Sequence, residues 1–255
     1  QPAREPEAGP QRVAAVIAAR DDRDTIAQTV RACRAIPGVD LVVVVDDGSE
    51  DDTGAAARMG GAAVVRHSVP RGRASALETG VKVVAMRDRP DWPARHVLFL
   101  DADLGDSAVE SSALVDAVTS GEADCAIGVP EPSEDAPAGR LHRGVSRSVR
   151  KRNGWGPLDP LATNRCITRE ALADVMPFAT SSAVDLAMTL DALTSGAKVV
   201  EIPCRFDRAP EKSKPKGSRW RAKWPDVWWT VRSRRFGRLW PHPQKRSGSA
   251  QQIVD

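Results

Sequence analysis

The sequence has 255 residues, of which 41% are hydrophobic, and a formal net charge of +3. A chain of this length and composition can bury a sizeable core, which excludes a protein disordered throughout. Its four cysteines are far apart and form no Cys-x-x-Cys pair, which argues against a zinc site and against a disulfide framework.

Strands and helices are predicted to alternate along the first part of the chain. After a loose leader at 1–11, continuous apolar runs predict buried strands, and segments with helical spacing of apolar residues lie between them. The predicted strands cover 13–18, 41–45, 62–66 and 96–100, and the predicted helices cover 24–36, 52–58 and 74–86. This alternation with short links is typical of an α/β fold with a mostly parallel central sheet flanked by helices.

Acidic residues follow three of these strands: Asp21 and Asp22 the first, Asp46 and Asp47 the second, and Asp101 and Asp103 the fourth. Because ligands of such sheets bind beyond the carboxyl ends of the strands, we expect these carboxylates to gather there. Asp101 and Asp103 stand at i and i+2, so in an extended chain they leave on the same side and can converge on one cation. Mg²⁺ and Mn²⁺ suit carboxylate ligands, and Mg²⁺ often takes only one or two of them. A solvated acidic turn is the alternative explanation of an Asp-x-Asp pair.

Two common phosphate-binding loops do not occur in the sequence. It contains neither G-x-G-x-x-G nor G-x-x-x-x-G-K-[ST]. A nucleotide would instead be held by carboxylates on its base or ribose and by a metal ion on its phosphates. For Asp46 and Asp47 the alternative is turn chemistry at a helix start, where carboxylates are also favoured.

Four motifs in order resemble the GT-A glycosyltransferases of family 2, particularly the dolichol-phosphate-mannose-synthase-like branch. Residues 16–22 (V-I-A-A-R-D-D) are similar to the family's V-I-P-A-Y-N-E, and residues 45–53 (V-D-D-G-S-E-D-D-T) to its V-D-D-G-S-x-D-x-T. Residues 72–80 (G-R-A-S-A-L-E-T-G) are similar to its G-K-G-A-A-L-x-x-G, and 100–104 (L-D-A-D-L) match its metal motif. Arg73 stands where the family has Lys. Ala18 and Arg20 replace its Pro and Tyr.

The resemblance implies a GT-A, Rossmann-like fold that binds a nucleoside-diphosphate sugar and a divalent cation, Mg²⁺ or Mn²⁺. It places the metal on Asp101 and Asp103. The nucleotide-sugar site that it implies consists of Ala18, Arg20, Asp22, Asp46, Asp47, Arg73, Asp101 and Ala102.

Two carboxylates of the second half are candidate catalytic residues. Residues 159–172 resemble the family's D-x-x-S-G-F-R-x-x-x-R-E-x-L, with Asp159 at its acidic position. A helix predicted over 182–193 carries Asp185 among apolar residues, where the family usually has Glu. Asp159 and Asp185 are therefore expected either to act as a base or to position the acceptor. A strand at 124–129 and a Pro-rich loop at 130–139, a candidate lid, precede them.

The predicted acceptor side is basic. After a strand at 198–203, residues 205–214 resemble a family segment that ends in S-K, and the resemblance assigns Arg208, Lys212, Ser213 and Lys214 to phosphate or acceptor binding. Guanidinium and ammonium groups only donate hydrogen bonds and phosphate oxygens only accept them, so this chemistry is complementary. The cations of 141–152 are expected either to meet an acceptor or to form a solvated helix face.

The composition changes after the expected catalytic domain at 12–216. The appendage 217–255 is rich in Trp and Arg, and Pro225 and Asp226 predict a helix start. Such a helix can lie at a membrane surface, pack its tryptophans on the domain, or stack them on single-stranded nucleic acid. The acidic first half argues against nucleic acid.

These features together predict a metal-dependent glycosyltransferase that uses a UDP- or GDP-sugar. The resemblance implies inversion at the anomeric carbon and, together with the basic residues and the tail, favours a polyprenyl phosphate acceptor. A hydroxyl of a small metabolite or natural product is the alternative acceptor. A sugar-1-phosphate nucleotidyltransferase and a non-catalytic membrane-binding module are the alternatives of another class. With no signal peptide and no apolar run of ~20 residues, we expect a cytoplasmic protein, peripheral on the inner face of the membrane if its tail binds lipid.

Overall fold

The computed structural model describes residues 11–131, 140–207 and 224–233. Within these ranges one sheet contains β1 (Val13–Ala19), β2 (Val39–Asp46), β3 (Ala63–Arg66), β4 (His96–Asp101), β5 (Cys125–Pro130), β6 (Arg165–Ile167) and β7 (Val199–Cys204). The helices are α1 (Ile26–Arg34), α2 (Thr53–Gly60), α3 (Arg73–Met86), α4 (Ser112–Thr119), α5 (Arg140–Asn153), α6 (Arg169–Val175), α7 (Val184–Ser195) and α8 (Trp224–Ser233), with a 3₁₀ helix, η1 (Gly105–Ser111).

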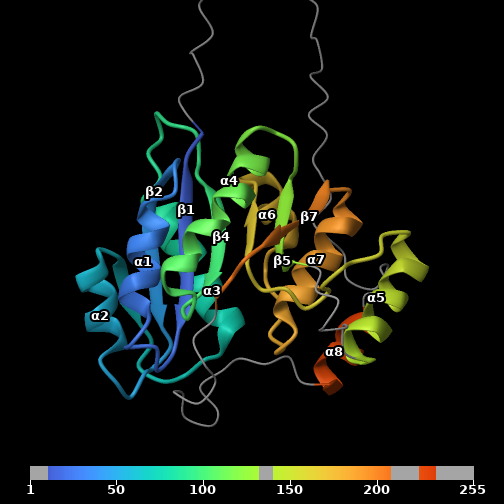
Figure 1. Ribbon diagram of the computed structural model, residues 1–255, viewed down its shortest axis with the longest axis horizontal. Helices are drawn as coiled ribbons and strands as arrows, with labels where there is room; N and C mark the ends of the chain where they lie inside the picture. The colour runs from blue at the N-terminus through green and yellow to red at the C-terminus, as the bar shows by residue number, and fades with distance from the viewer. Residues whose placement is uncertain (1–10, 132–139, 208–223, 234–255) are drawn as a thin grey trace, which may run out of the picture.

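The strand order across the sheet is β3-β2-β1-β4-β6-β5-β7 (Figure 1). β6 runs antiparallel to β4 and β5, and the other pairs are parallel. The prediction of a mostly parallel sheet is therefore confirmed. The sequence reasoning assigned no strand to Arg165–Ile167, because a run of three residues beginning with a buried arginine carries no periodicity to detect.

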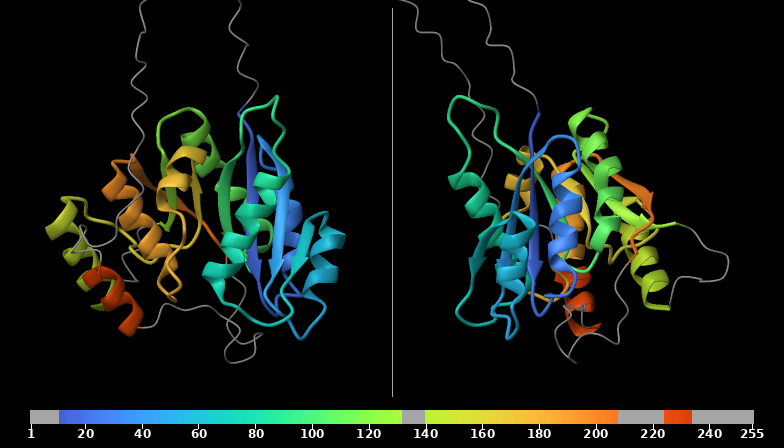
Figure 2. Two further views of the ribbon diagram at one scale, coloured as in Figure 1. Left: turned by 180° about the vertical axis from the view of Figure 1, so that it is seen from behind. Right: turned by 60° about the vertical axis from the view of Figure 1, so that its left-hand side comes forward.

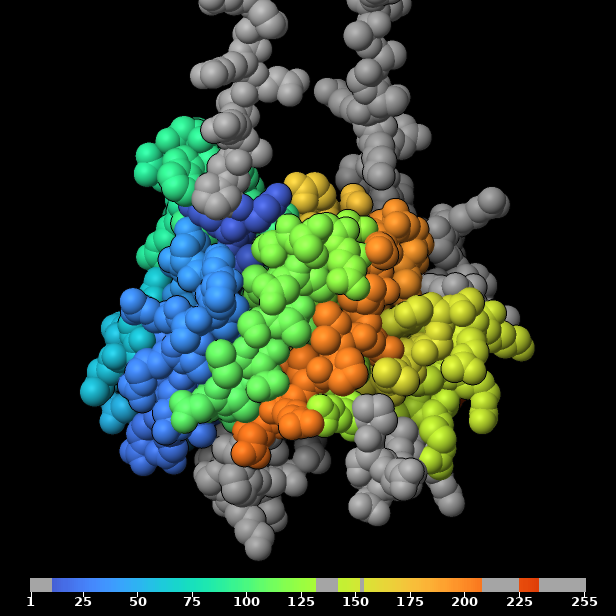
Figure 3. All heavy atoms as spheres, turned by 45° about the horizontal axis from the view of Figure 1, so that its top comes forward, coloured from blue at the N-terminus to red at the C-terminus, as the bar shows by residue number. Residues whose placement is uncertain are grey.

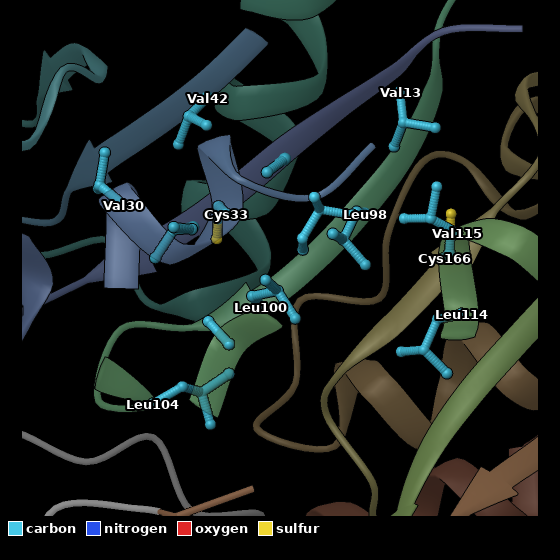
Figure 4. Packing of buried hydrophobic residues seen from close by; sticks show 14 of the residues in the cluster. Val13, Val30, Cys33, Val42, Leu98, Leu100, Leu104, Leu114, Val115 and Cys166 are labelled. Carbon is cyan, nitrogen blue, oxygen red and sulfur yellow. The ribbon is translucent and has the colours of Figure 1, made fainter. Parts of the chain in front are cut away.

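Alternate residues of each central strand enter two different cores. In β1, Val13, Ala15 and Ile17 join a cluster with α1 and α4 (Figure 4), whereas Ala14 and Val16 join a cluster with α3, α6 and α7. α1 and α4 lie in front of the sheet in Figure 1, and α3, α6 and α7 lie in front when it is seen from behind in Figure 2. Both faces are covered, which explains why β1 reads as a continuous apolar run.

A third, smaller cluster lies beside the β7 edge of the sheet. It joins α5, α7 and α8, so the described part of the Trp-rich appendage contacts the domain. None of the helices in the described ranges has the length and apolar character that crossing a membrane requires. The predicted boundary between 216 and 217 falls outside the described residues.

Candidate active site

The strand register gathers the acidic strand ends at one edge of the sheet. Ala18 of β1 pairs with Val45 of β2 on one side and with Asp101 of β4 on the other, so the loops that follow these three strands leave together. Ala18 itself is only 2% exposed and packs in the core. The loop after β1, with Arg20 and Asp22, therefore borders the loops after β2 and β4.

Asp46 and Asp47 shape the loops around them. Both are fully buried. Asp46 Oδ1 accepts a hydrogen bond from the Ser49 amide at 2.9 Å. Asp47 accepts from the amides of Arg71 and Gly72, both at 2.8 Å, and its Oδ1 lies 2.7 Å from His67 Nδ1. Asp47 thus fixes the loop that leads into α3, and a nucleotide contact of either carboxylate stays a prediction.

Gly48 is required by the backbone of this turn. Its φ is +72°, and a Cβ there would lie 2.9 Å from the Pro70 ring. A side chain would therefore be both strained and sterically excluded, which explains the Asp-Gly pair that the motif carries.

Asp22 and its neighbours tie the first loop to the second. Asp22 Oδ2 accepts from the Arg20 amide at 3.0 Å, and the Asp22 amide donates to Thr53 Oγ1 at 2.8 Å. Asp21, with a φ of 53°, accepts from the Glu50 amide at 2.8 Å. Asp22 is buried and Arg20 half-buried, so this pair lines the base of the loop.

The turn Asp101-Ala102-Asp103 is held by residues that the sequence reasoning did not single out. The Asp101 amide donates to Asn164 Oδ1 at 2.9 Å. The hydroxyl of Thr29 in α1 donates to the Ala102 carbonyl at 2.9 Å and accepts from the Gly105 amide at 2.9 Å. Thr29 thus forms hydrogen bonds with the turn on both sides of Asp103. A threonine on the core-facing side of α1 was the only sequence signal for this role, and it is a weak one.

Arg73 connects the acidic turn to α7. It is 6% exposed, and its Nη1 lies 3.1 Å from Asp101 Oδ1. Its Nε and Nη2 donate to the two oxygens of Asp185 at 2.9 Å and 3.3 Å. Thr163 completes the group, because its hydroxyl donates to Asp101 Oδ2 at 2.5 Å. Two carboxylates predicted for different roles therefore share one guanidinium.

These partners stabilise the charged form of Arg73. Burial alone lowers the pKa of a guanidinium, but the nearby Asp185 and Asp101 carboxylates outweigh burial and raise the pKa of Arg73 above its ordinary value. The side chain is therefore a permanent cation between two anions. The expectation that Asp185 lies only among apolar neighbours is wrong, because α3 places Arg73 against it.

The acidic turn has the donor chemistry that Mg²⁺ or Mn²⁺ requires. Asp101, the last residue of β4, and Asp103, two positions later, carry hard carboxylate oxygens at the carboxyl end of the strand. Among the described residues no group of three or more His, Cys, Asp or Glu side chains is arranged to hold a metal ion. A cation here would complete its shell from a substrate diphosphate and water, which fits a site with two protein carboxylates.

Asp159 lies in a separate polar group, and its predicted role towards an acceptor stays a prediction. Its Oδ1 accepts from the Leu161 amide at 3.0 Å and lies 3.3 Å from His142 Nε2 on α5. The hydrogen bond with Asp159 raises the pKa of His142 above its ordinary value, although partial burial opposes it. Glu201 of β7 accepts from the Leu158 and Asp159 amides, and burial raises its pKa despite these bonds.

The predicted phosphate-binding residues Arg208, Lys212, Ser213 and Lys214 lie outside the described residues. Asp207, which precedes them, is among the described residues. The Asp207 amide donates to Ser107 Oγ at 2.9 Å, and Ser107 Oγ donates to the Leu104 carbonyl at 2.6 Å. The end of β7 runs along η1 and α4 (Figure 3), so Asp207 lies close to the acidic turn.

Replacing Thr29 with Val is expected to loosen the acidic turn. The isosteric side chain keeps the volume but leaves a buried amide and a buried carbonyl without their partner, which costs about 1–3 kcal/mol of unfolding free energy. Mn²⁺ affinity should fall roughly tenfold, as for other residues that orient metal ligands. Urea denaturation and calorimetric Mn²⁺ titration measure both effects. Thr29→Ser keeps the hydroxyl and is the control, and equal behaviour of the two variants would contradict this role.

The chain matches the family model described as glycosyl transferase family 2 over residues 14–174. No curated protein matches it. Solved structures of glucosyl-3-phosphoglycerate synthase from Mycobacterium tuberculosis are similar in fold. One, with Mn²⁺, UDP and phosphoglyceric acid, has a TM-score of 0.65 and 21% identity, and the match covers 88% of this chain and 78% of that chain.

A second structure of that synthase, with Mg²⁺ and UDP, has a TM-score of 0.64 and 22% identity over 88% of this chain and 79% of that one. A third structure of the synthase has a TM-score of 0.66 and 24% identity, and the match covers 88% of this chain and 80% of that chain. At these identities the likeness shows the fold, and the predicted GT-A fold is confirmed. Because the family model spans more than half of the sequence, the chain belongs to glycosyl transferase family 2.

Proposed function

We propose that this chain is a divalent-cation-dependent, inverting glycosyltransferase that moves a sugar from a uridine-diphosphate sugar to a polyprenyl phosphate. Family membership supports the reaction class. The donor and cofactor are supported by the acidic turn and by similar folds crystallised with UDP, UDP-glucose and Mn²⁺ or Mg²⁺. When bound, the cation would stabilise negative charge on the leaving diphosphate.

In this proposal, different residues of the chain bind the cation, the nucleotide and the phosphate. Asp101 and Asp103 would hold the cation, and the loops of Asp22, Asp46 and Asp47 would form the nucleotide side. Arg73 orients Asp101 and adds fixed positive charge next to it. Arg208, Lys212, Ser213 and Lys214 would bind phosphate. The hydrogen bond of Asp207 to Ser107 supports this assignment, since it brings the chain to η1 immediately before Arg208.

The arrangement of Asp185 is the observation that favours a phosphate acceptor. Both of its oxygens accept hydrogen bonds from Arg73, and Arg165 Nη2 lies 4.0 Å from Oδ1. A carboxylate that is paired with guanidinium groups in this way is arranged to position cations and not to take a proton. A phosphate monoester needs no such base, because its second pKa of about 6 leaves it ionised at pH 7. With an alcohol acceptor, a positioned general base would raise the rate of transfer roughly 10²–10⁴-fold.

Transfer to the hydroxyl of a small phosphorylated metabolite is the second candidate. The similar synthase is crystallised with phosphoglyceric acid, a small molecule. In this chain Asp159 pairs with the imidazole of His142, which can lose its charge, whereas the guanidinium beside Asp185 cannot. In this alternative Asp159 takes the proton of the attacking hydroxyl.

Product formation from UDP-glucose and other UDP-sugars with Mn²⁺ distinguishes the two. We expect turnover on a short polyprenyl phosphate and none on phosphoglyceric acid. Asp185→Asn should weaken acceptor binding severalfold without removing the acidic limb of the pH profile, which is the fall in rate that protonation of a general base causes. Asp116→Asn, an exposed change on α4, should change nothing. Turnover only on the soluble hydroxyl acceptor, with kcat collapsing in Asp159→Asn, would establish the alternative.

A further inference from the structure

The helix α8 packs on the domain through its valines. Val227 and Val231, at i and i+4, enter the third cluster together with Val145 and Val149 of α5. Asp226 Oδ2 fixes the start of α8 by accepting from the amide of Ser182 at 3.1 Å and from its hydroxyl at 2.6 Å. The helix therefore has a defined seat on α5 and α7.

Trp228 and Trp229 of α8 take no part in that packing. Trp228 is 61% exposed and Trp229 is 70% exposed, while Val227 is 1% exposed. Successive helix residues are 100° apart, so the two indoles point away from the valine face. An adjacent pair of exposed indoles is unusual for a surface that meets only water, because each is large and mostly apolar.

The neighbouring helix α5 presents positive charge in the same region. The sequence of Arg140–Asn153 contains no acidic residue. Val145 and Val149 face the third cluster, whereas Arg147, Arg150 and Lys151 are exposed. α5 and α8 lie side by side beside α7 in Figure 1 and in the view from behind in Figure 2. An exposed cation, Arg232, also ends α8.

We infer that the outward faces of α5 and α8 together form a surface that binds an anionic lipid bilayer. Indoles are stable at headgroup depth, and arginine and lysine beside them meet lipid phosphates. A protein partner would be expected to bury a wider apolar area than two indoles among cations. The inference does not rest on the proposed acceptor.

The placement of this surface suits an enzyme that works at a membrane. Ser182, which α8 holds through Asp226, lies three residues before Asp185 in the sequence, at the start of α7. Binding through α5 and α8 would therefore bring the Arg73–Asp185 end of the site towards the lipid surface. An acceptor carried in the bilayer could then reach it without leaving the headgroup region.

Cosedimentation of the full-length chain with vesicles tests the inference. We expect binding to phosphatidylcholine vesicles that contain phosphatidylglycerol, weakened by salt, and little binding to phosphatidylcholine alone. Trp228→Ser with Trp229→Ser should weaken binding at least about tenfold. Arg147→Gln with Lys151→Gln should weaken it roughly 30-fold, since each cation near an anionic surface contributes about 1 kcal/mol.

Matched controls lie at the opposite edge of the sheet or in a distant loop. Trp92→Ser removes a 41% exposed indole, and Arg31→Gln with Arg58→Gln removes two exposed cations from α1 and α2. These variants should bind vesicles as the parent does. In every variant, stabilisation by UDP and Mn²⁺ should be kept, so a failure at vesicles is distinguishable from a failure of nucleotide binding.

Two results would overturn the inference. One is a full-length protein that ignores phosphatidylglycerol vesicles at low salt, or that loses binding equally in control and test variants. The other is binding of single-stranded oligonucleotide that the α5 and α8 substitutions abolish while vesicle binding persists, which would assign the surface to nucleic acid.

Discussion

Replacing Arg73 with Met is expected to destabilise the protein by about 3–5 kcal/mol, because it leaves the buried Asp185 and the partly buried Asp101 without their shared cation. Methionine fills most of the volume, so the loss reports charge and hydrogen bonding and not a cavity. Urea denaturation at pH 7, followed by circular dichroism, measures it. A variant as stable as the parent would show that the guanidinium is not needed to balance these carboxylates.

The same position explains two departures from the family pattern. Arg73 replaces the family's Lys, and Asp185 replaces its usual Glu, and the structure places these two residues in direct contact. A longer cation thus meets a shorter acid. Arg73 also uses separate nitrogens for Asp101 and Asp185, which the single ammonium of a lysine cannot do with the same geometry.

A double-mutant cycle checks this coupling. Arg73→Lys and Asp185→Glu should each destabilise, and the double variant should lose less than the sum of the two, with an interaction free energy of roughly 0.5–3 kcal/mol. Additive losses would show that the exchange at the two positions is not compensatory.

Replacing Asp101 with Asn is expected to abolish metal-dependent nucleotide binding while the fold persists. The amide removes one of two anionic ligands, and we expect Mn²⁺ affinity to fall about a hundredfold or more. For the parent, UDP and Mn²⁺ at a hundred times the dissociation constant should stabilise the fold by about 2.7 kcal/mol, and this gain should vanish in Asp101→Asn. Thermal unfolding with and without UDP and Mn²⁺ measures the difference.

Two further variants define what that result means. Asp103→Asn should lose the same stabilisation, because it supplies the second carboxylate. Asp106→Asn, an exposed acid of the adjacent η1, should keep it. Undiminished Mn²⁺-dependent UDP stabilisation in both Asp101→Asn and Asp103→Asn would remove the metal site from the acidic turn.

The sheet and its acidic edge could be predicted from local patterns in the sequence. Apolar runs such as that of β1 are local, and the acidic residues that end β1, β2 and β4 need only the rule that parallel strands end together. The family followed from short motifs of the same local kind, such as residues 45–53 and 100–104. Element ends agreed to within about two residues for the first four strands, since turn residues mark them.

The partner of each buried charge, in contrast, follows from long-range packing and could not be predicted. Arg73 and Asp185 are 112 residues apart, and Asp101 and Asn164 are 63 apart, so no local pattern links them. The same holds for Thr29, whose hydrogen bonds to the acidic turn depend on how α1 packs against η1, and for Asp47, which holds the loop before α3. A Trp-rich helix was predicted at α8, but Val227 and Val231, and not Trp228 and Trp229, pack on the domain. The shape of the neighbouring helices selects the buried face of a helix that is apolar on more than one side.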